Sequence, residues 1–155
     1  MFKDMPREAL YQFARQQVPC VGFNVRRATR LVTQYYDKIL MPTGLRSTQY
    51  SLMNVLEFVA EISIQDLSLV LAMDRTTLTR NLRPLSSQGW VKIVQAEDKR
   101  IRLISLTAKG REKMSKAFPY WQEAQSSIVA QIGASNWNVL LDGLHRVSIA
   151  AENGF

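Results

Sequence analysis

The leucines of residues 74–90 recur with the period of an amphipathic helix. They are Leu78, Leu82 and Leu85, spaced i, i+4 and i+7. Asp74 is a residue type that caps helix N-termini, and Gly89 is typical of the position just after a helix. We expect Pro84 to kink or weaken the last turns, because it has no N–H group for the carbonyl of Arg80.

The face opposite these leucines combines short hydroxyl side chains with long cations. It carries Thr76, Thr79, Arg80, Arg83 and Ser87. Short side chains let a helix approach a duplex closely, and threonine and arginine both bind phosphates and base edges. A solvated helix face, with its arginines serving only solubility, explains this segment equally well. The neighbouring segments have to decide between the two interpretations.

Those neighbours predict a helix-turn-helix followed by a hairpin. Ser63 and Asp66 form a capping pattern ahead of a short apolar helix, and a tight turn at residues 73–74 leads into the helix of residues 75–87. After Gly89 the period changes, and residues 90–95 and 100–106 alternate like two strands around a polar turn. A plain hairpin could simply cover the core, but its charged tip beside a basic helix favours a DNA-binding wing.

Helices are predicted on both sides of this module. They cover residues 7–18, 20–40 and 47–59, the last starting at Ser47 or Thr48, and then a long helix from Ala108 that Thr107 caps and Pro119 bends. A break at residues 133–135 precedes a last helix with one apolar face. That face carries Trp137, Leu140, Leu141, Leu144, Val147 and Ala151. The predicted fold is mainly α with a small β-hairpin wing.

This pattern suggests three functional segments. We expect residues 1–42 to form an N-terminal dimerisation part, residues 43–107 a winged helix-turn-helix domain, and residues 108–155 the C-terminal dimerisation helices. The flanking helices hold more apolar surface than a lone winged module could cover. A homodimer built by both chain ends is the economical solution.

Composition excludes several classes of protein. The 155 residues suit one domain, no apolar run reaches the ~18 residues of a membrane span, and the N-terminus has no signal-peptide pattern. The single cysteine suits a reducing cytoplasm. We find no zinc spacing, no P-loop, and no nucleophile–base pair or metal cluster. We therefore expect a cytoplasmic protein that is not an enzyme and uses no cofactor or metal.

The positive charge is concentrated in one region. The chain has a net charge of +7, and residues 74–113 account for +6 of it with ten basic and four acidic residues. Nucleic acid or an anionic membrane is the expected partner of such a patch. A membrane would require a bulky apolar face beside the cations. The face here is threonine and serine, which favours double-stranded DNA.

Four segments together resemble the MarR family of winged helix-turn-helix regulators over nearly the whole chain. They are GLRSTQYSLM at 44–53, the helix-turn-helix from Ser63 to Gly89, the wing with Asp98-Lys99-Arg100, and LTAKG at 106–110, which is similar to the family's Leu-Thr-x-x-Gly. The resemblance implies an obligate homodimer of triangular shape whose terminal helices dimerise. Its two modules would read the half-sites of a palindrome about 34 Å apart.

The resemblance also assigns roles to residues. In such proteins the helix at 75–87 reads the major groove, which points to Thr76, Thr77, Thr79, Arg80 and Arg83, with Arg75 near the backbone. The wing residue Arg100 would enter the minor groove, with Asp98 orienting it through an ion pair. Ser47, Thr48 and Gln49 would contact phosphates at a helix start, and Lys99 and Arg102 would add phosphate contacts.

Family members commonly release DNA when a small, often aromatic or anionic, ligand binds between the dimer helices and the reading module. Tyr35, Tyr36, Phe58 and Trp121 are candidate pocket aromatics, although core packing explains each equally well. We expect a repressor of this kind, while an activator would need the same contacts. A dimeric interaction protein with only non-specific DNA affinity is the alternative from another class.

Two single residues raise further alternatives. Cys20 opens the helix of residues 20–40, and because a helix N-terminus stabilises a thiolate, a peroxide-sensing regulator is one interpretation. The favoured interpretation is that Cys20 is buried as a small hydrophobic residue. His145 is the only histidine, and without a cluster of partner ligands it suits a polar helix edge better than a metal site.

Overall fold

The computed structural model describes residues 5–17 and 19–154, and they form a mainly helical chain with one small sheet. The helices are α1 (Arg7–Gln17), α2 (Val21–Leu40), α3 (Ser47–Val59), α4 (Ile64–Val70), α5 (Arg75–Ser87), α6 (Ala108–Ile132) and α7 (Ala134–Glu152), with a short 3-10 helix η1 (Met41–Thr43). The strands are β1 (Glu61–Ser63), β2 (Val91–Gln95) and β3 (Arg102–Leu106). The predicted fold class is confirmed.

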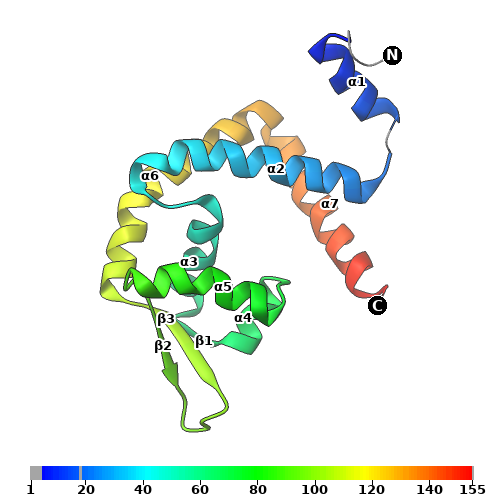
Figure 1. The fold of residues 1–155 in the computed structure, drawn as a ribbon. Coiled ribbons are helices and arrows are strands. Elements are labelled where there is room, and N and C mark those ends of the chain that lie inside the picture. The colour runs from blue at the N-terminus through cyan, green and yellow to red at the C-terminus, as the bar shows by residue number, and fades with distance from the viewer. Residues whose placement is uncertain (1–4, 18, 155) are drawn as a thin grey trace.

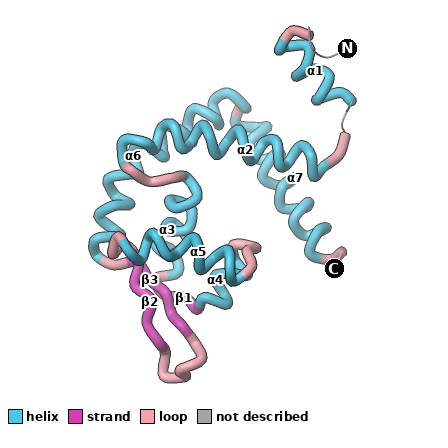
Figure 2. The backbone as a smooth tube through the Cα atoms, in the orientation of Figure 1, coloured by secondary structure: helices cyan, strands magenta, loops and turns pink. Residues whose placement is uncertain are grey.

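The helices form two tiers. In Figure 1, α2 crosses above a compact group made of α3, α4, α5 and the sheet. Helix α6 rises from the base of the wing to the level of α2, α7 then passes behind α2 and descends on the other side, and α1 lies beyond the N-terminal end of α2. Figure 2 shows the hairpin of β2 and β3 projecting from the compact group on the side away from α2. The wing therefore projects away from the rest of the chain, where it can contact a partner molecule.

Side-chain caps fix the two helices of the helix-turn-helix, as the sequence predicts. Ser63 accepts from the backbone N–H of Asp66 at 3.0 Å, and Asp74 accepts from that of Thr77 at 2.8 Å. Between the helices, Ala72 adopts a positive φ of 47°, which closes the turn. Leu78, Leu82 and Leu85 are buried, so the predicted stripe of α5 does face the core.

Helix α5 ends at a glycine as expected, but Pro84 does not interrupt it. Gly89 has a φ of 71°, and the N–H of Trp90 reaches back to the carbonyl of Leu85 at 2.9 Å. Helix α5 continues through Pro84 to Ser87, so the missing N–H group does not end the helix. The carbonyl of Arg80, which loses its partner, lies on the exposed face where water can replace the missing bond.

The sheet has a third strand that the sequence analysis did not predict. The strand order is β1-β3-β2, and both pairings are antiparallel, with Ile62 opposite Ile104 and Val94 opposite Leu103. Strand β1 directly precedes α4, so it joins the wing to the helix-turn-helix. Ile104 is fully buried in the core that α3 and α5 share with the sheet.

The start of α6 is fixed against the end of α5. Thr107 accepts from the N–H of Gly110 at 3.0 Å, and its hydroxyl donates to the carbonyl of Gly89 at 2.7 Å. A Cβ at Gly110 would lie 2.0 Å from the carbonyl oxygen of Trp90, so only glycine fits there. Farther along α6, the ammonium of Lys113 lies 4.9 Å from the Trp90 ring centroid and donates to the carbonyl of Thr43. These contacts tie the base of the wing to the upper tier.

The terminal helices leave apolar side chains exposed. Throughout the described length of α7, no side chain is buried. Its exposed large hydrophobic residues are Val139, Leu140, Leu141, Leu144, Val147 and Ile149. On α1 and α2 they include Leu10, Tyr11, Phe13, Val21, Leu31 and Val32. A bilayer-spanning helix, long and apolar enough for that role, is not found among the described residues.

Candidate nucleic-acid interface

The outer face of α5 presents the predicted cations and hydroxyls to solvent. Its exposed residues include Arg75, Thr76, Thr79, Arg80, Arg83 and Ser87. The guanidinium of Arg75 donates to the side-chain oxygen of Gln65 at 2.7 Å, which links α5 to α4. The hydroxyl of Thr79 donates to the carbonyl of Arg75 at 2.7 Å. The face is therefore both cationic and partly ordered before any partner arrives.

Thr77 differs from its neighbours. It is half-buried, and its hydroxyl donates to Asp74 at 2.6 Å while its backbone N–H donates to the same carboxylate. The hydrogen bonds from the Thr77 side chain and backbone lower the pKa of Asp74 below its ordinary value, so the cap is ionised at neutral pH. Thr77 thus fixes the start of α5 more directly than it offers a free hydroxyl.

The start of α3 is held by a residue of α2. The backbone N–H and the hydroxyl of Ser47 both donate to Oδ1 of Asp37, each at 2.7 Å. The side chain of Gln49 accepts from the backbone N–H of Arg46 at 2.9 Å. Of the three predicted phosphate ligands on α3, Thr48 is the exposed one, whereas Ser47 and Gln49 are half-buried.

Helices α3 and α5 meet at a shallow cleft that carries two arginines. The cleft has a volume of about 290 Å³, and Arg46, Thr48, Gln49, Leu52, Arg80, Asn81 and Pro84 line it. Arg46 and Asn81 were missed by the sequence analysis. For Arg46 the available signal was its position directly before a helix start. Asn81 gave none, because its amide lies half-buried and donates to the sulfur of Met73 at 3.7 Å.

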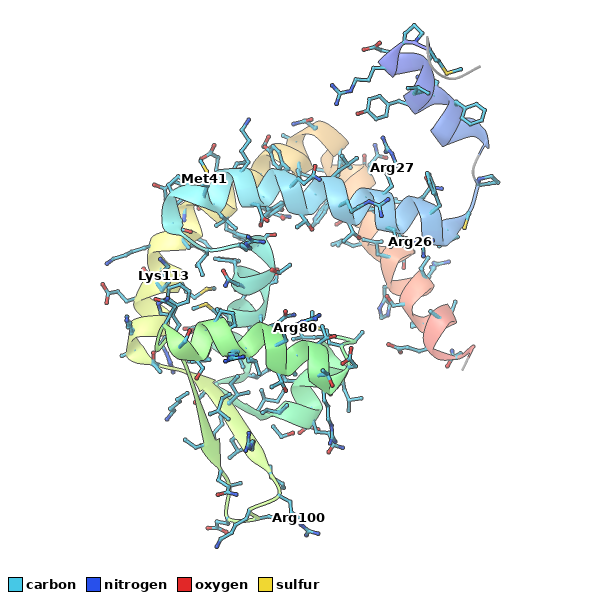
Figure 3. All side chains as sticks on the ribbon, viewed as in Figure 1. Arg26, Arg27, Met41, Arg80, Arg100 and Lys113 are labelled. Atoms are coloured by element: carbon cyan, nitrogen blue, oxygen red, sulfur yellow. The ribbon has the colours of Figure 1, made fainter. Side chains whose placement is uncertain are left out.

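Asp98 and Arg100 form the predicted ion pair at the tip of the wing. Nε and Nη2 of Arg100 donate to the two carboxylate oxygens of Asp98 at 3.1 and 3.0 Å. The side chain of Arg100 is nevertheless 90% exposed. These hydrogen bonds lower the pKa of Asp98 below its ordinary value. Figure 3 shows Arg100 at the end of the hairpin, well separated from Arg80 on α5.

A wide groove of about 760 Å³ separates the wing from the helix-turn-helix. Arg75 and Thr79 line it on the α5 side, and Arg100 and Arg102 line it on the wing side. The structure therefore places cations on both walls of one open groove, which Glu61 and Asp66 also line. Lys99 is exposed beside Arg100, where its backbone carbonyl accepts from Gln95 at 2.7 Å.

Two of the four candidate pocket aromatics line one cavity between the upper tier and the reading module. Tyr36 and Trp121 are among the residues around this cavity of about 370 Å³. Tyr35 is not part of the cavity lining, and its ring packs in a T-shaped arrangement with Tyr36 at 6.2 Å between centroids. Phe58 lies outside the cavity and its side chain is 83% exposed on α3.

The remaining candidates lie apart from these sites. Cys20 precedes α2 and is exposed, so the favoured interpretation of a buried small hydrophobe is wrong in this chain. His145 is exposed on α7, as expected for a helix-edge residue. A search of the described residues finds no group of His, Cys, Asp or Glu side chains that could hold a metal ion.

Comparison with known proteins gives matches in sequence and in fold. The family model described as "Winged helix DNA-binding domain" matches residues 47–110. The uncharacterised HTH-type transcriptional regulator YwoH of Bacillus subtilis (strain 168) is 30% identical over 89 residues. That alignment covers 57% of this chain and 65% of YwoH, so the chain spans just under two thirds of that relative's length.

Two solved structures extend the match to nearly the whole chain. The transcriptional regulator MosR of M. tuberculosis, in complex with DNA, is 35% identical with a TM-score of 0.80, and the match covers 86% of this chain and 97% of MosR. A MarR variant from E. coli in complex with operator DNA is 24% identical, with a TM-score of 0.76 over 87% of this chain and 96% of that one. This second likeness concerns the fold alone.

Proposed function

Because the chain belongs to the MarR family of winged helix-turn-helix regulators, we propose that it is a transcriptional repressor which binds a palindromic operator as a homodimer. A small ligand would release it. In this proposal residues 1–42 and 108–155 serve dimerisation, and residues 43–107 bind DNA. The relatives found are regulators rather than enzymes, and one of them, MosR, is described in complex with DNA.

The groove between α5 and the wing is the observation that carries the DNA-binding part. A DNA strand lying along it would meet Arg75 on one side and Arg102 on the other, so its phosphates would be neutralised from both walls. With the backbone held there, α5 enters the major groove on one side of the strand. The wing tip with Arg100 then enters the minor groove on the other side.

The exposed residues divide into readers and positioning contacts. Thr76, Thr79, Arg80 and Arg83 face the base edges, and Arg100 reads the width of the minor groove. Arg75, Thr48, Lys99 and Arg102 contact phosphates. Ser47, Gln49, Thr77 and Asp98 complete the interface by holding the helix starts and the wing tip in place.

The exposed apolar faces of the terminal helices support the homodimer. Soluble monomers rarely expose contiguous apolar patches of this kind, and a two-fold axis lets one helix face cover its own copy. Helix α7 supplies one such face, with no buried residue along its described length. A dimer also gives two reading helices, which a palindromic operator requires.

Selection of purified protein on random DNA duplexes at near-physiological salt tests the proposal. We expect the survivors to share a palindrome with half-sites about one helical turn apart. Survivors without a shared motif, combined with affinity that collapses as salt rises, would leave only phosphate attraction. The proposal would then be wrong, and the interaction protein with non-specific DNA affinity would replace it.

The exposure of Cys20 supports a second candidate, a thiol-based regulator. Hydrogen peroxide would release such a protein from DNA, and Cys20→Ser would remain bound. Ligand release alone predicts that peroxide has no effect on either protein. A gel-shift titration of both proteins with and without peroxide separates the two mechanisms.

A further inference from the structure

The cavity beneath α2 is walled by uncharged side chains. It lies where α2, α3, the turn after α4 and α6 meet. Its lining consists of Val32, Thr33, Tyr36, Ser47, Thr48, Ser51, Leu52, Leu71, Met73, Trp121 and Gln125, so within the described chain it contains no Lys, Arg, His, Asp or Glu. A cavity of about 370 Å³ with this mixture of apolar, hydroxyl and amide groups is suited to a small ring-containing molecule.

A helix N-terminus beside this wall, which would attract an anion, is already occupied. The N-terminus of α3 carries the positive end of a helix dipole, and Ser47 and Thr48 of its first turn line the cavity. Asp37 accepts both the backbone N–H and the hydroxyl of Ser47 at 2.7 Å. An anionic ligand would therefore find a carboxylate directly behind Ser47, and like charges repel.

The cation next to Ser47 in the sequence serves a different cleft. Arg46 precedes Ser47 in the chain, but it lines the cleft shared with Arg80 on the face that we assign to DNA. Thr48 and Leu52 line both spaces, so the first turn of α3 divides a cationic cleft from an uncharged cavity. An anion is thus attracted to the first space and disfavoured in the second.

Two polar groups in the wall can recognise a neutral ligand. The hydroxyl of Tyr36 donates to Oε1 of Gln125 at 2.5 Å. Burial, with a smaller contribution from Tyr35, raises the pKa of Tyr36, so its hydroxyl stays protonated. The pair then offers the Gln125 amide N–H group as a donor and the Tyr36 oxygen as an acceptor. Trp121, stacked on Tyr50 with centroids 5.7 Å apart, gives a fixed aromatic wall.

We propose that the effector is an uncharged aromatic molecule with an amide or hydroxyl group, and that the Asp37 carboxylate excludes aromatic carboxylates from the cavity. The inference rests on the ligand-released repressor proposed above and specifies the chemistry of its ligand. Asp37 is a specificity-determining residue in this account, since it acts on the ligand through its charge behind Ser47.

Isothermal titration of the full chain without DNA tests this directly. The probes are two matched pairs, 4-hydroxybenzamide with 4-hydroxybenzoate and 2-naphthamide with 2-naphthoate, at neutral pH. We expect the amide of at least one pair to bind at least about tenfold more tightly than its carboxylate, as a 1.4 kcal/mol difference would give. Ser51→Phe, at an exposed position of the wall, should abolish that binding by filling the cavity.

Two variants separate the charge of Asp37 from its structural role. Both bonds from Ser47 end on a single oxygen of Asp37, so Asp37→Asn can keep them and remove only the charge. The preference for the amide should then shrink toward equal affinity. Asp37→Glu retains the charge and should retain the preference.

Four results would overturn the inference. They are equal or tighter binding of the carboxylates to the unmodified protein, no binding of either amide, unchanged binding in Ser51→Phe, or an unchanged preference in Asp37→Asn. The repressor proposal fails separately, because it depends on DNA selection. If the protein binds the amides but selects no operator, the repressor proposal is wrong and the ligand chemistry stands. If it selects an operator but binds no amide, the repressor proposal stands and the ligand chemistry is wrong.

Discussion

Both carboxylate oxygens of Asp98 accept hydrogen bonds from Arg100 at the tip of the wing, yet the Arg100 side chain remains almost fully exposed. The backbone N–H of Arg100 donates to the same carboxylate at 3.0 Å, so the turn and the side chain share one anchor. The tip is thereby ordered without being covered. An arginine held in this way loses less conformational entropy when it enters a narrow groove.

Removing Asp98 should weaken operator binding without removing a DNA contact. We expect Asp98→Ala to raise the Kd several-fold, and Arg100→Ala to raise it by about tenfold or more, because the second change removes the contact itself. Fluorescence anisotropy with the selected operator measures both. Equal losses for the two variants would mean that Asp98 itself contacts the DNA or that the wing has collapsed.

The ion pair at the tip also predicts a pH dependence. Arg100 lowers the pKa of Asp98, so the pair is intact above the ordinary aspartate value of 3.8 and is lost as the pH falls through the lowered value. The effect of Asp98→Ala on operator affinity should therefore be constant between pH 6 and 8. A mutational effect that changed within that window would contradict this assignment.

Arg80 and Lys99 should differ in the kind of effect they have. Arg80→Ala should change the base preference, because Arg80 lies on the outer face of α5. Lys99→Ala should weaken binding to all duplexes alike. The slope of log K against the logarithm of the salt concentration should become shallower by about one. Repeating the duplex selection with each variant shows the difference. If both variants lost affinity uniformly, Arg80 would be a phosphate ligand and not a reader.

Gly110→Ala should strongly destabilise the fold, since the added Cβ would meet the Trp90 carbonyl oxygen at 2.0 Å. We expect a loss of about 3 kcal/mol in the free energy of unfolding, the upper range for overpacking. Gly22→Ala is the matched control, because its Cβ would meet only the end of the flexible Arg26 side chain at 3.3 Å. Urea denaturation of both variants is the measurement, and equal stabilities would contradict the close approach of α6 to Trp90.

A single charge on the apolar face of α7 should dissociate the proposed dimer. Leu144 is 44% exposed in the chain, and Leu144→Glu would bury a carboxylate in the dimer contact. Light scattering after size exclusion should show a monomer. Asn138→Glu, on another face of the same helix, should remain dimeric. A dimeric Leu144→Glu would place the interface elsewhere.

Local patterns explain most of what the sequence predicted correctly. The caps at Ser63, Asp74 and Thr107, and the glycine after α5, each depend on residues a few positions apart. The hairpin of β2 and β3 is equally local, and so is the Asp98–Arg100 pair, which the family resemblance pointed to. Such features are visible in a sequence because side chain and partner lie in one short window.

The features that were missed depend on contacts distant in sequence. Strand β1 has three residues, and it exists because Ile62 pairs with Ile104 far along the chain. Asp37 reaches Ser47 only because η1 turns the chain between α2 and α3. Helix α5 runs through Pro84 to Ser87, and Leu85 next to the proline is buried in the core. Tertiary packing decided each of these cases.

The most direct test of the account compares the affinity of the purified protein for its selected palindrome with its affinity for a scrambled duplex at near-physiological salt. A dimer that reads bases through α5 and the wing should prefer the palindrome by about 10³-fold or more. A ratio near one, with both affinities falling together as salt rises, would show a generic cationic surface and contradict the proposed function.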